Sequence, residues 1–415
     1  MPASSLHILV IARAWPQPNR PMLQRLQSLL ARGWQVTFAS PGAPGQDDAD
    51  LSAMQAVRLV DSDFERMLGE LTPDAVLFEH FELEERFAWR VEQHCPDALR
   101  MLDSGDLQSL REGRHALLRR RLALGLDPND FRELFATSGS DLYQQMAPAE
   151  LTRREIAAIH RSDLSLVVSD VEMDLLVNGF GVPPALLHWC PPMPEAPRTA
   201  TAPFSERKHI IAFVDFRDPA DRDSLLWLKH NIWPMIRRHL PDAQLHVHGP
   251  SPTAKALALH DPAGGLLIFE QGAEPATLLG KARLCLLPLR FGAGIKGVLL
   301  DAMLAGTPSV TTPIGSEAMQ GGQAWPGLVS ATAEGLAKAV IGLYADEARW
   351  NQAQRDAAAL LDSHFNRRWH AAALAERIEQ TLMELADQRL YNFTGAMLRQ
   401  QRRPLSDAAA TDRYP

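Results

Sequence analysis

The sequence predicts an α/β protein made of two doubly wound, Rossmann-like domains that face a cleft. Its 415 residues are enough for two domains of ordinary size, and 46% hydrophobic residues can fill two cores. Short apolar runs alternate with amphipathic stretches along the chain, as in parallel strands connected by covering helices. A proline-rich segment interrupts this alternation near the middle of the chain. Ligands of such folds bind beyond the carboxyl ends of the strands.

The first half of the chain contains the expected elements of an N-terminal domain over residues 1–190. Apolar runs predict buried strands at residues 6–12, 35–39, 75–78, 99–102 and 164–168. A helix is expected between the first two strands, because apolar residues recur at helical spacing from Met22 to Leu30 and Gly33 can end the helix as a C-cap. Residues 106–162 are charged and helical in pattern, so we expect long helices or an insertion beside the sheet.

The second half restarts the same alternation after a linker that we place at residues 191–208, where prolines are dense. A C-terminal domain is expected over residues 209–365. Its predicted strands lie at residues 210–214, 244–248, 266–269, 284–287 and 309–311. The helical run at residues 366–390 is expected to return to the N-terminal domain, and the polar residues 391–415 are expected to form a disordered tail.

Composition and charge exclude several classes of function. The net charge of −8 argues against a general nucleic-acid binder, which needs a basic surface. Three distant cysteines form no zinc spacing and fit a reducing compartment, so a cytoplasmic location is expected. The apolar run at residues 7–12 is too short for a signal segment, and no apolar run reaches the roughly 18 residues of a membrane span.

A glycine-rich loop is the strongest functional signal in the chain. Gly292, Ala293 and Gly294 follow a predicted strand, and Lys296 stands where the next helix opens. Glycines permit close backbone approach, and the N-terminus of a helix attracts anions, so the pattern indicates a diphosphate site. A plain tight turn with a solvated lysine remains the simpler alternative.

Two other phosphate motifs fit this loop poorly. A dinucleotide site requires an acid at the end of the next strand, whereas the first acid here is Glu317, beyond a turn. The P-loop pattern is absent. Asp301, in contrast, lies five residues beyond Lys296, about 7–8 Å along a helix, which suits the ribose of a nucleotide whose diphosphate lies at the lysine. An acid that merely solvates the helix is the alternative.

These residues carry a family resemblance. Residues 288–297 and 301–312 resemble the donor-binding signature of retaining GT-B glycosyltransferases of group 1, which are also called family 4-like. Residues 213–219, with Trp227 and Trp233, resemble the start of the C-terminal domain of that family. Residues 161–172 resemble the last strand of its N-terminal domain. The similarity spans most of residues 5–385.

The resemblance implies a metal-independent enzyme whose donor substrate is a nucleoside-diphosphate sugar, with no further cofactor. The C-terminal domain would hold the donor, and the N-terminal domain would hold a glycan or lipid-linked acceptor. Transfer in bacterial surface polysaccharide synthesis, with peripheral contact to the cytoplasmic membrane, is the expected setting. Lys296 and Arg217 would stabilise the departing diphosphate. The loop from Gly292 to Ile295 would bind the donor, and Asp301 would hold the ribose.

The chain departs from the family pattern in two places. Ala293 stands where the first of two spaced glutamates is usual, and only the second position, Asp301, keeps a carboxylate. The first βα loop, at residues 15–21, is rich in proline and lacks the usual Gly-Gly pair. Arg20 in that loop is a candidate anion ligand, or else the solvated arginine of a rigid turn.

Three residues are candidates on the acceptor side. Asp103 follows a predicted strand, and the resemblance places a group that contacts the sugar or the acceptor near it. Asp106 is either a further acceptor-side residue or, more simply, the N-cap of the next helix. His80, which also follows a strand, is a candidate that a structural role would equally explain. Two alternative functions remain open: a sugar-nucleotide epimerase of the same fold, and a nucleotide-binding module that has lost catalysis.

Overall fold

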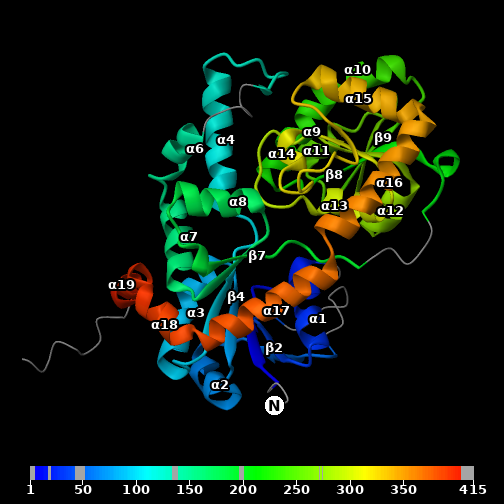
Figure 1. The fold of residues 1–415 in the computed structure, drawn as a ribbon. Coiled ribbons are helices and arrows are strands. Elements are labelled where there is room, and N and C mark those ends of the chain that lie inside the picture. Colours follow the sequence, from blue (N-terminus) through cyan, green and yellow to red (C-terminus); the bar gives the residue numbers. More distant parts are fainter. Residues whose placement is uncertain are drawn as a thin grey trace, which may run out of the picture. The chain divides into compact units, whose positions relative to one another are not determined.

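The computed structural model describes residues 5–16, 20–42, 52–132, 139–195, 201–270, 272 and 274–402. The chain forms two compact units (Figure 1). The first unit comprises Met1–Asp106, Glu150–Pro194 and Arg367–Pro415, and the second comprises Leu107–Ala149 and Glu195–Asn366. The chain therefore passes between the units four times. Parts of the predicted linker (196–200), of the first loop (17–19) and of the predicted tail (403–415) lie outside the described residues.

The first unit is built on a seven-stranded parallel sheet with the order β3-β2-β1-β4-β5-β6-β7. The strands are β1 (His7–Ile11), β2 (Gln35–Ser40), β3 (Gln55–Arg58), β4 (Ala75–Glu79), β5 (Leu99–Asp103), β6 (Leu164–Val167) and β7 (Leu187–Trp189). Because β2 and β4 flank β1 on opposite sides, the strand order reverses between β1 and β4. That reversal is where ligands bind in doubly wound sheets.

Eight α-helices of the described residues belong to the first unit. They are α1 (Pro21–Ala31), α2 (Phe64–Leu71), α3 (Phe81–His94), α7 (Glu150–Arg161), α8 (Asp170–Asp174), α17 (Arg367–Met383), α18 (Leu385–Tyr391) and α19 (Phe393–Arg402). Pro21 opens α1, and Gly33 follows its end with φ +89° as the predicted C-cap glycine. Helix α17 packs against α1, where Arg32 donates to Glu379 at 2.9 Å. The tail prediction is wrong for residues 393–402, which form α19, because its Gly395 packs closely on the His160 carbonyl of α7.

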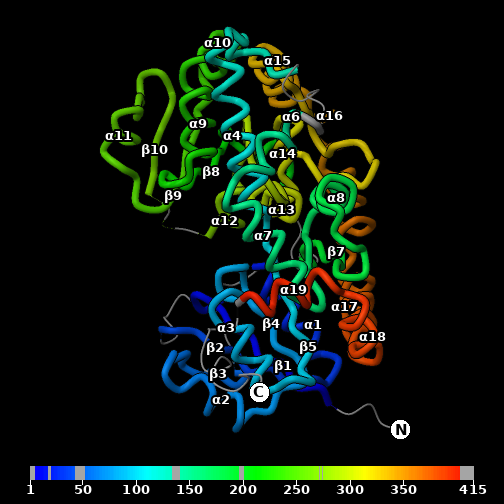
Figure 2. Tube along the Cα trace, turned by 90° about the vertical axis from the view of Figure 1, so that its left-hand side faces the viewer, coloured from blue at the N-terminus to red at the C-terminus, as the bar shows by residue number. Residues whose placement is uncertain are grey.

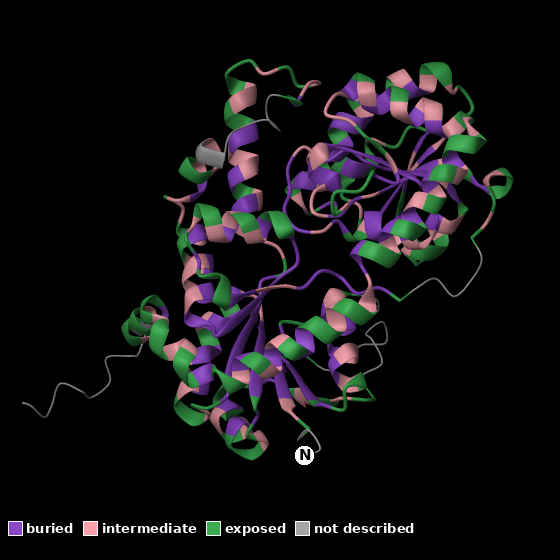
Figure 3. Cartoon of the chain, in the orientation of Figure 1, coloured by how far each residue is buried: buried purple, intermediate pink, exposed green. Residues whose placement is uncertain are grey.

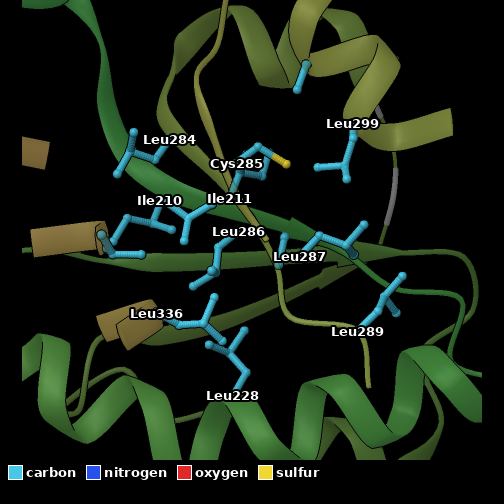
Figure 4. Packing of buried hydrophobic residues seen from close by; sticks show 14 of the residues in the cluster. Ile210, Ile211, Leu228, Leu284, Cys285, Leu286, Leu287, Leu289, Leu299 and Leu336 are labelled. Carbon is cyan, nitrogen blue, oxygen red and sulfur yellow. The ribbon is translucent and has the colours of Figure 1, made fainter. Parts of the chain in front are cut away.

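The second unit contains a six-stranded parallel sheet with the order β10-β9-β8-β11-β12-β13. The strands are β8 (Lys208–Phe213), β9 (Leu245–Gly249), β10 (Leu266–Glu270), β11 (Ala282–Leu287), β12 (Ser309–Thr311) and β13 (Gly327–Val329). The order reverses between β8 and β11. Apolar side chains cover both faces of the sheet: Cys285 and Leu299 pack on one side, and Leu228 and Leu336 on the other (Figure 4).

Ten α-helices of the described residues belong to the second unit. They are α4 (Gln108–Ala123), α6 (Gly139–Met146), α9 (Pro219–Trp227), α10 (Trp233–His239), α11 (Ala254–Leu257), α12 (Pro275–Lys281), α13 (Gly297–Leu304), α14 (Pro313–Ser316), α15 (Ala333–Ala345) and α16 (Glu347–His364). Helices α10 and α15 lie side by side (Figure 2). The strands of both sheets are largely buried (Figure 3). No helix of the described residues is both long and apolar enough to cross a membrane.

The segment 107–149 corrects the predicted domain boundary. Residues 1–190 were expected to form one domain, whereas this segment belongs to the second unit. Leu118 and Phe131 are buried in the core of that unit. The backbone N–H of Phe131 donates to the Ala331 carbonyl at 2.9 Å, and Asp130 forms an isolated antiparallel bridge with Thr332. Burial of these side chains therefore decides where the segment belongs.

Candidate functional site

The glycine loop follows β11, one of the two strands at which the second sheet reverses its order. This is the position that the sequence predicted for a phosphate site. Helix α13 begins directly after the loop at Gly297, with Lys296 as its N-cap residue. The loop is therefore joined to the N-terminus of a helix, where backbone N–H groups and the helix dipole favour anions.

Lys296 holds the loop from inside. Its ammonium is buried and donates to the carbonyls of Ala293 at 3.0 Å and Gly294 at 2.6 Å. Both carbonyls converge on one cation because Gly294 has a φ of +62°, a left-handed conformation that glycine adopts at little cost. In a planar trans peptide the N–H points opposite to the C=O, so the N–H groups of Gly294 and Ile295 point away from the ammonium.

The side chain of Lys296 also packs against the loop. A Cβ at Gly292 would lie in van der Waals contact with it, 3.4 Å from Lys296 Cε. Ala293 is buried, and Ile295 packs against the core of the second unit. Asp301 is half-buried on α13. Burial of the Cys285 thiol, with a smaller effect from the Asp301 charge, raises the pKa of Cys285 to about 12.

The loop between β8 and α9 lies at the other strand of the reversal. Arg217 is exposed there, and its backbone N–H donates to Asp215 Oδ1 at 2.9 Å. Asp218 caps α9 by accepting from the N–H groups of Ala220 and Asp221. Burial raises the pKa of Asp221 to about 6. The structure thus places Arg217 and Lys296 on the two loops of the same reversal.

Helix α4 supplies contacts that the sequence did not reveal. Arg114 donates to the Gly292 carbonyl at 2.8 Å and binds both carboxylate oxygens of Glu317, at 2.8 and 2.6 Å. The His115 ring stacks on Phe291, with centroids 4.3 Å apart. Arg111 pairs with Asp218 at 3.2 Å. The spacing of residues 111, 114 and 115 places them on one helical face. It does not predict their partners, which lie over 100 residues away in the chain.

In the first unit, Asp103 is buried at the end of β5 and pairs with Arg25 of α1. Its other carboxylate oxygen accepts from the Gly105 N–H at 3.1 Å. Arg25 also donates to the Cys190 carbonyl at 3.1 Å. Asp103 does follow a strand, as predicted, but its carboxylate ties α1, β5 and the end of β7 together.

His80 lies at the reversal of the first sheet and has the features of a binding residue. Its φ of +83° with ψ of 150° is strained for any residue with a side chain. Arg13 donates to His80 Nδ1, and the backbone N–H of His80 donates to the Asp103 carbonyl at 2.9 Å. Burial, with the Arg13 charge, lowers the pKa of His80 to about 4, so the ring is neutral at pH 7.

The tautomer of His80 follows from this contact. Since Nδ1 accepts from a guanidinium, the proton is on Nε2, which is buried without a hydrogen-bond partner among the described residues. Asp106 is close enough for its charge to act on the His80 pKa. Burial also raises the pKa of Glu79, which accepts from the Arg13 N–H at 3.0 Å.

The N-cap prediction for Asp106 is wrong, whereas the position of Arg20 leaves its expected role a prediction. Asp106 is not the N-cap of α4: the helix begins one residue later than expected, with Leu107 as N-cap residue and no side-chain cap. Arg20 is exposed just before α1. Within the described ranges, His, Cys, Asp and Glu side chains form no group of three or more able to hold a metal.

Comparison with known proteins agrees with this geometry. Residues 207–346 match the model of the family described as Glycosyl transferases group 1. The family resemblance is confirmed there. This region contains the whole glycine loop, α13 and the β8–α9 loop, and it covers about a third of the chain. None of the curated proteins has a sequence that matches this chain.

Solved GT-B glycosyltransferase structures share the fold across both units. TarM, known from S. aureus, superposes with a TM-score of 0.66 at 8% identity, covering 92% of this chain and 99% of TarM. Sucrose-phosphate synthase from Thermosynechococcus elongatus gives 0.62 at 14% identity, covering 90% and 98%. Anabaena HepE in complex with UDP-glucose gives 0.64 at 11% identity, covering 90% and 100%. At such identities the match establishes the fold, which is the two-domain α/β fold of GT-B glycosyltransferases.

Proposed function

We propose that the protein is a retaining glycosyltransferase that moves a sugar from a nucleoside-diphosphate sugar to a glycan or lipid-linked acceptor. One observation carries the proposal: the glycine loop, held by Lys296 at the N-terminus of α13, lies at the strand reversal of a group 1 glycosyltransferase domain. The structure of HepE with UDP-glucose supports a sugar nucleotide as donor. The nucleobase is left open.

In this proposal the second unit carries the leaving group. The bond from the anomeric carbon to the diphosphate breaks, and its electron pair goes to the diphosphate oxygen. The loop N–H groups, the α13 N-terminus, Lys296 and Arg217 stabilise that charge, without a metal in the scheme. The acceptor hydroxyl attacks from the same face, and a donor phosphate oxygen takes its proton. Asp301, half-buried on α13, binds the ribose.

We assign the acceptor side to the first unit. The buried Nε2–H of His80 would donate to a hydroxyl of the sugar or acceptor, because this strained, neutral imidazole has no other partner for that proton. Asp103 acts through Arg25 as a positioning residue, and Asp106 contributes charge beside His80. Arg20, exposed before α1, binds an anionic group of the acceptor.

The proposed setting is surface polysaccharide synthesis at the cytoplasmic face of a bacterial membrane. WaaG, a solved structure of the same fold with a TM-score of 0.54 and 13% identity, is named as a glycosyltransferase of lipopolysaccharide biosynthesis. The last three helices expose large apolar side chains, including Leu390 at 74%, Tyr391 at 84% and Phe393 at 74% exposure. Such residues favour peripheral contact with lipid.

A second candidate is a nucleotide-binding module without transfer activity. It is favoured by Ala293, a buried methyl group where the family has a glutamate. Thermal unfolding with UDP, GDP, dTDP, ADP and CMP separates these functions. We expect one nucleoside diphosphate to raise the Tm of the wild type and of Lys338→Ala, an exposed lysine on α15, but not of Lys296→Ala.

The outcomes are distinct. If no nucleotide stabilises the wild type, the donor site does not exist. If one does and the matching sugar nucleotide is neither transferred nor slowly hydrolysed, the binding module is correct. Conversion of the free sugar nucleotide into its epimer would instead identify an epimerase.

A further inference from the structure

We propose that Arg114 of α4 is a positioning residue for the diphosphate, which acts by fixing the peptide between Gly292 and Ala293. The inference rests on the proposed function, because it concerns the same loop. It assigns a role to a helix that lies outside the region matched by the family model, residues 207–346.

Arg114 binds the loop at one atom, the carbonyl oxygen of Gly292. Its Nη1 donates both to the Gly292 carbonyl at 2.8 Å and to Glu317 Oε1 at 2.8 Å, while Nη2 donates to Glu317 Oε2 at 2.6 Å. The side chains of Arg114 and Glu317 are only 14% and 15% exposed. These two parallel hydrogen bonds to Glu317 fix the plane of the guanidinium and so the direction of its bond to Gly292. The ammonium of a lysine has no such plane and would not be fixed in this way.

The direction of the Gly292 carbonyl determines the direction of the next N–H. The peptide is planar and trans, so the N–H of Ala293 points away from Arg114. Lys296 orients the next two peptides in the same way, through the carbonyls of Ala293 and Gly294. Two cations thus bind three successive carbonyls, and successive N–H groups on the other side of such a turn form an anion-binding concavity.

The ion pair with Glu317 distinguishes Arg114 from a residue that binds phosphate directly. Its carboxylate accepts two hydrogen bonds from the guanidinium and offsets its charge. Arg114 therefore contributes orientation to the site, whereas Lys296, at the entry to α13, contributes orientation and charge.

Neighbouring residues of α4 hold the rest of the reversal in the same way. His115 stacks on Phe291, directly before the glycine loop, and Arg111 binds Asp218, the cap of α9. Residues 111, 114 and 115 share one helical face. One face of α4 thus contacts both loops, after β8 and after β11, and Leu118 anchors it in the core.

The test compares the affinity for a nucleoside diphosphate with that for the matching nucleoside, by titration calorimetry. The ligand is the diphosphate that stabilises the wild type. Arg114→Gln is expected to weaken diphosphate binding about tenfold, the effect of losing one hydrogen bond from a charged donor. Nucleoside binding is expected to stay unchanged. Arg114→Lys keeps the charge but loses the two parallel hydrogen bonds, and is also expected to bind the diphosphate more weakly. Arg119→Gln, exposed on the same helix, is the matched control.

Each result decides the matter. Wild-type diphosphate affinity in Arg114→Gln, with loss in Lys296→Ala, overturns this inference alone. Equal weakening of diphosphate and nucleoside, with a lower Tm, also overturns it, because Arg114 then only stabilises the unit. If the wild type binds no nucleoside diphosphate, the proposed function and this inference both fail.

Discussion

Arg25 and Asp103 form an ion pair that is almost fully buried, with side chains 2% and 6% exposed. Removing one charge of such a pair leaves the other without compensation inside the protein. Asp103→Asn is therefore expected to destabilise the protein by about 3–5 kcal/mol, measured by urea denaturation. Asp97→Asn, an exposed change in the same unit, should be neutral.

A double replacement tests the same pair from the other side. Arg25→Met with Asp103→Leu removes both charges and is expected to recover much of the lost stability. An Asp103→Asn variant that keeps wild-type stability but no longer transfers sugar would show instead that Asp103 contacts the reacting groups.

The conformation of Gly294 predicts a selective effect on binding. Its φ of +62° costs any other residue about 1–2 kcal/mol, so Gly294→Ala should turn the Ala293 and Gly294 carbonyls away from Lys296 and lower nucleotide affinity. Gly297→Ala is the matched control, since a Cβ there meets nothing within 4 Å. Equal affinities in the two variants, measured by calorimetry, would contradict this account of the loop.

Arg207 is a buried cation whose described hydrogen-bond acceptors are oxygen atoms without a charge, and its guanidinium also lies over the Trp350 ring. It donates to the Ala305 carbonyl at 2.7 Å and to Thr307 Oγ1 at 2.6 Å, and burial lowers its pKa to about 10. Arg207→Met should leave these acceptors unsatisfied, at about 1–3 kcal/mol for each, and lower the Tm clearly. Arg349→Met on α16, at a side chain 70% exposed, should change stability by about 0.5 kcal/mol or less.

The stability of the protein should fall with acidification because of histidines such as His246. Burial, reinforced by His209 and His248, lowers the pKa of His246 to about 4, against 6.5 in a model peptide. Between these values the unfolded chain binds more protons than the folded one, so stability is full above the unfolded value and decreases as the pH falls toward 4. His246→Asn should reduce the loss of Tm between about pH 7 and pH 4.5. An unchanged pH dependence would contradict the assigned shift.

Membrane contact is expected to depend on the last helices. Phe393→Ser with Met397→Ser, two exposed positions one turn apart on α19, should reduce co-sedimentation with vesicles of anionic phospholipid. Leu257→Ser, which also removes an exposed apolar side chain but on α11, should leave co-sedimentation unchanged. Wild-type protein that stays in the supernatant would refute the proposed contact.

The interior strands could be predicted because both of their faces are buried. β1 and β11, for example, are nearly continuous apolar runs. The strands β3, β7 and β13 were missed because each lies at a sheet edge and is only three or four residues long. Partly exposed strands of that length give no periodic signal.

The candidate site shows a similar division. The glycine loop could be predicted because its chemistry is local, in the five consecutive residues from Gly292 to Lys296. The pairing of Asp103 with Arg25 joins residues 78 apart, and that of Arg114 with Glu317 joins residues 203 apart. The spacing of residues along the chain does not predict such long-range contacts. Only the structure therefore shows that α4 packs on the second unit.

Because the chain passes four times between the units, parts of the second unit are synthesised long before the core against which they pack. Phe131 is made about 200 residues before Ala331, the residue whose carbonyl its backbone N–H binds. Until the ribosome reaches that point, Leu118 and Phe131 lack the core in which they are buried, although β1 to β5 of the first sheet have already been made. These apolar side chains therefore stay without their native core while about half of the chain is synthesised. If the gene were divided at the proline-rich segment, Leu118 and Phe131 would be on the N-terminal fragment, apart from the core in which they are buried.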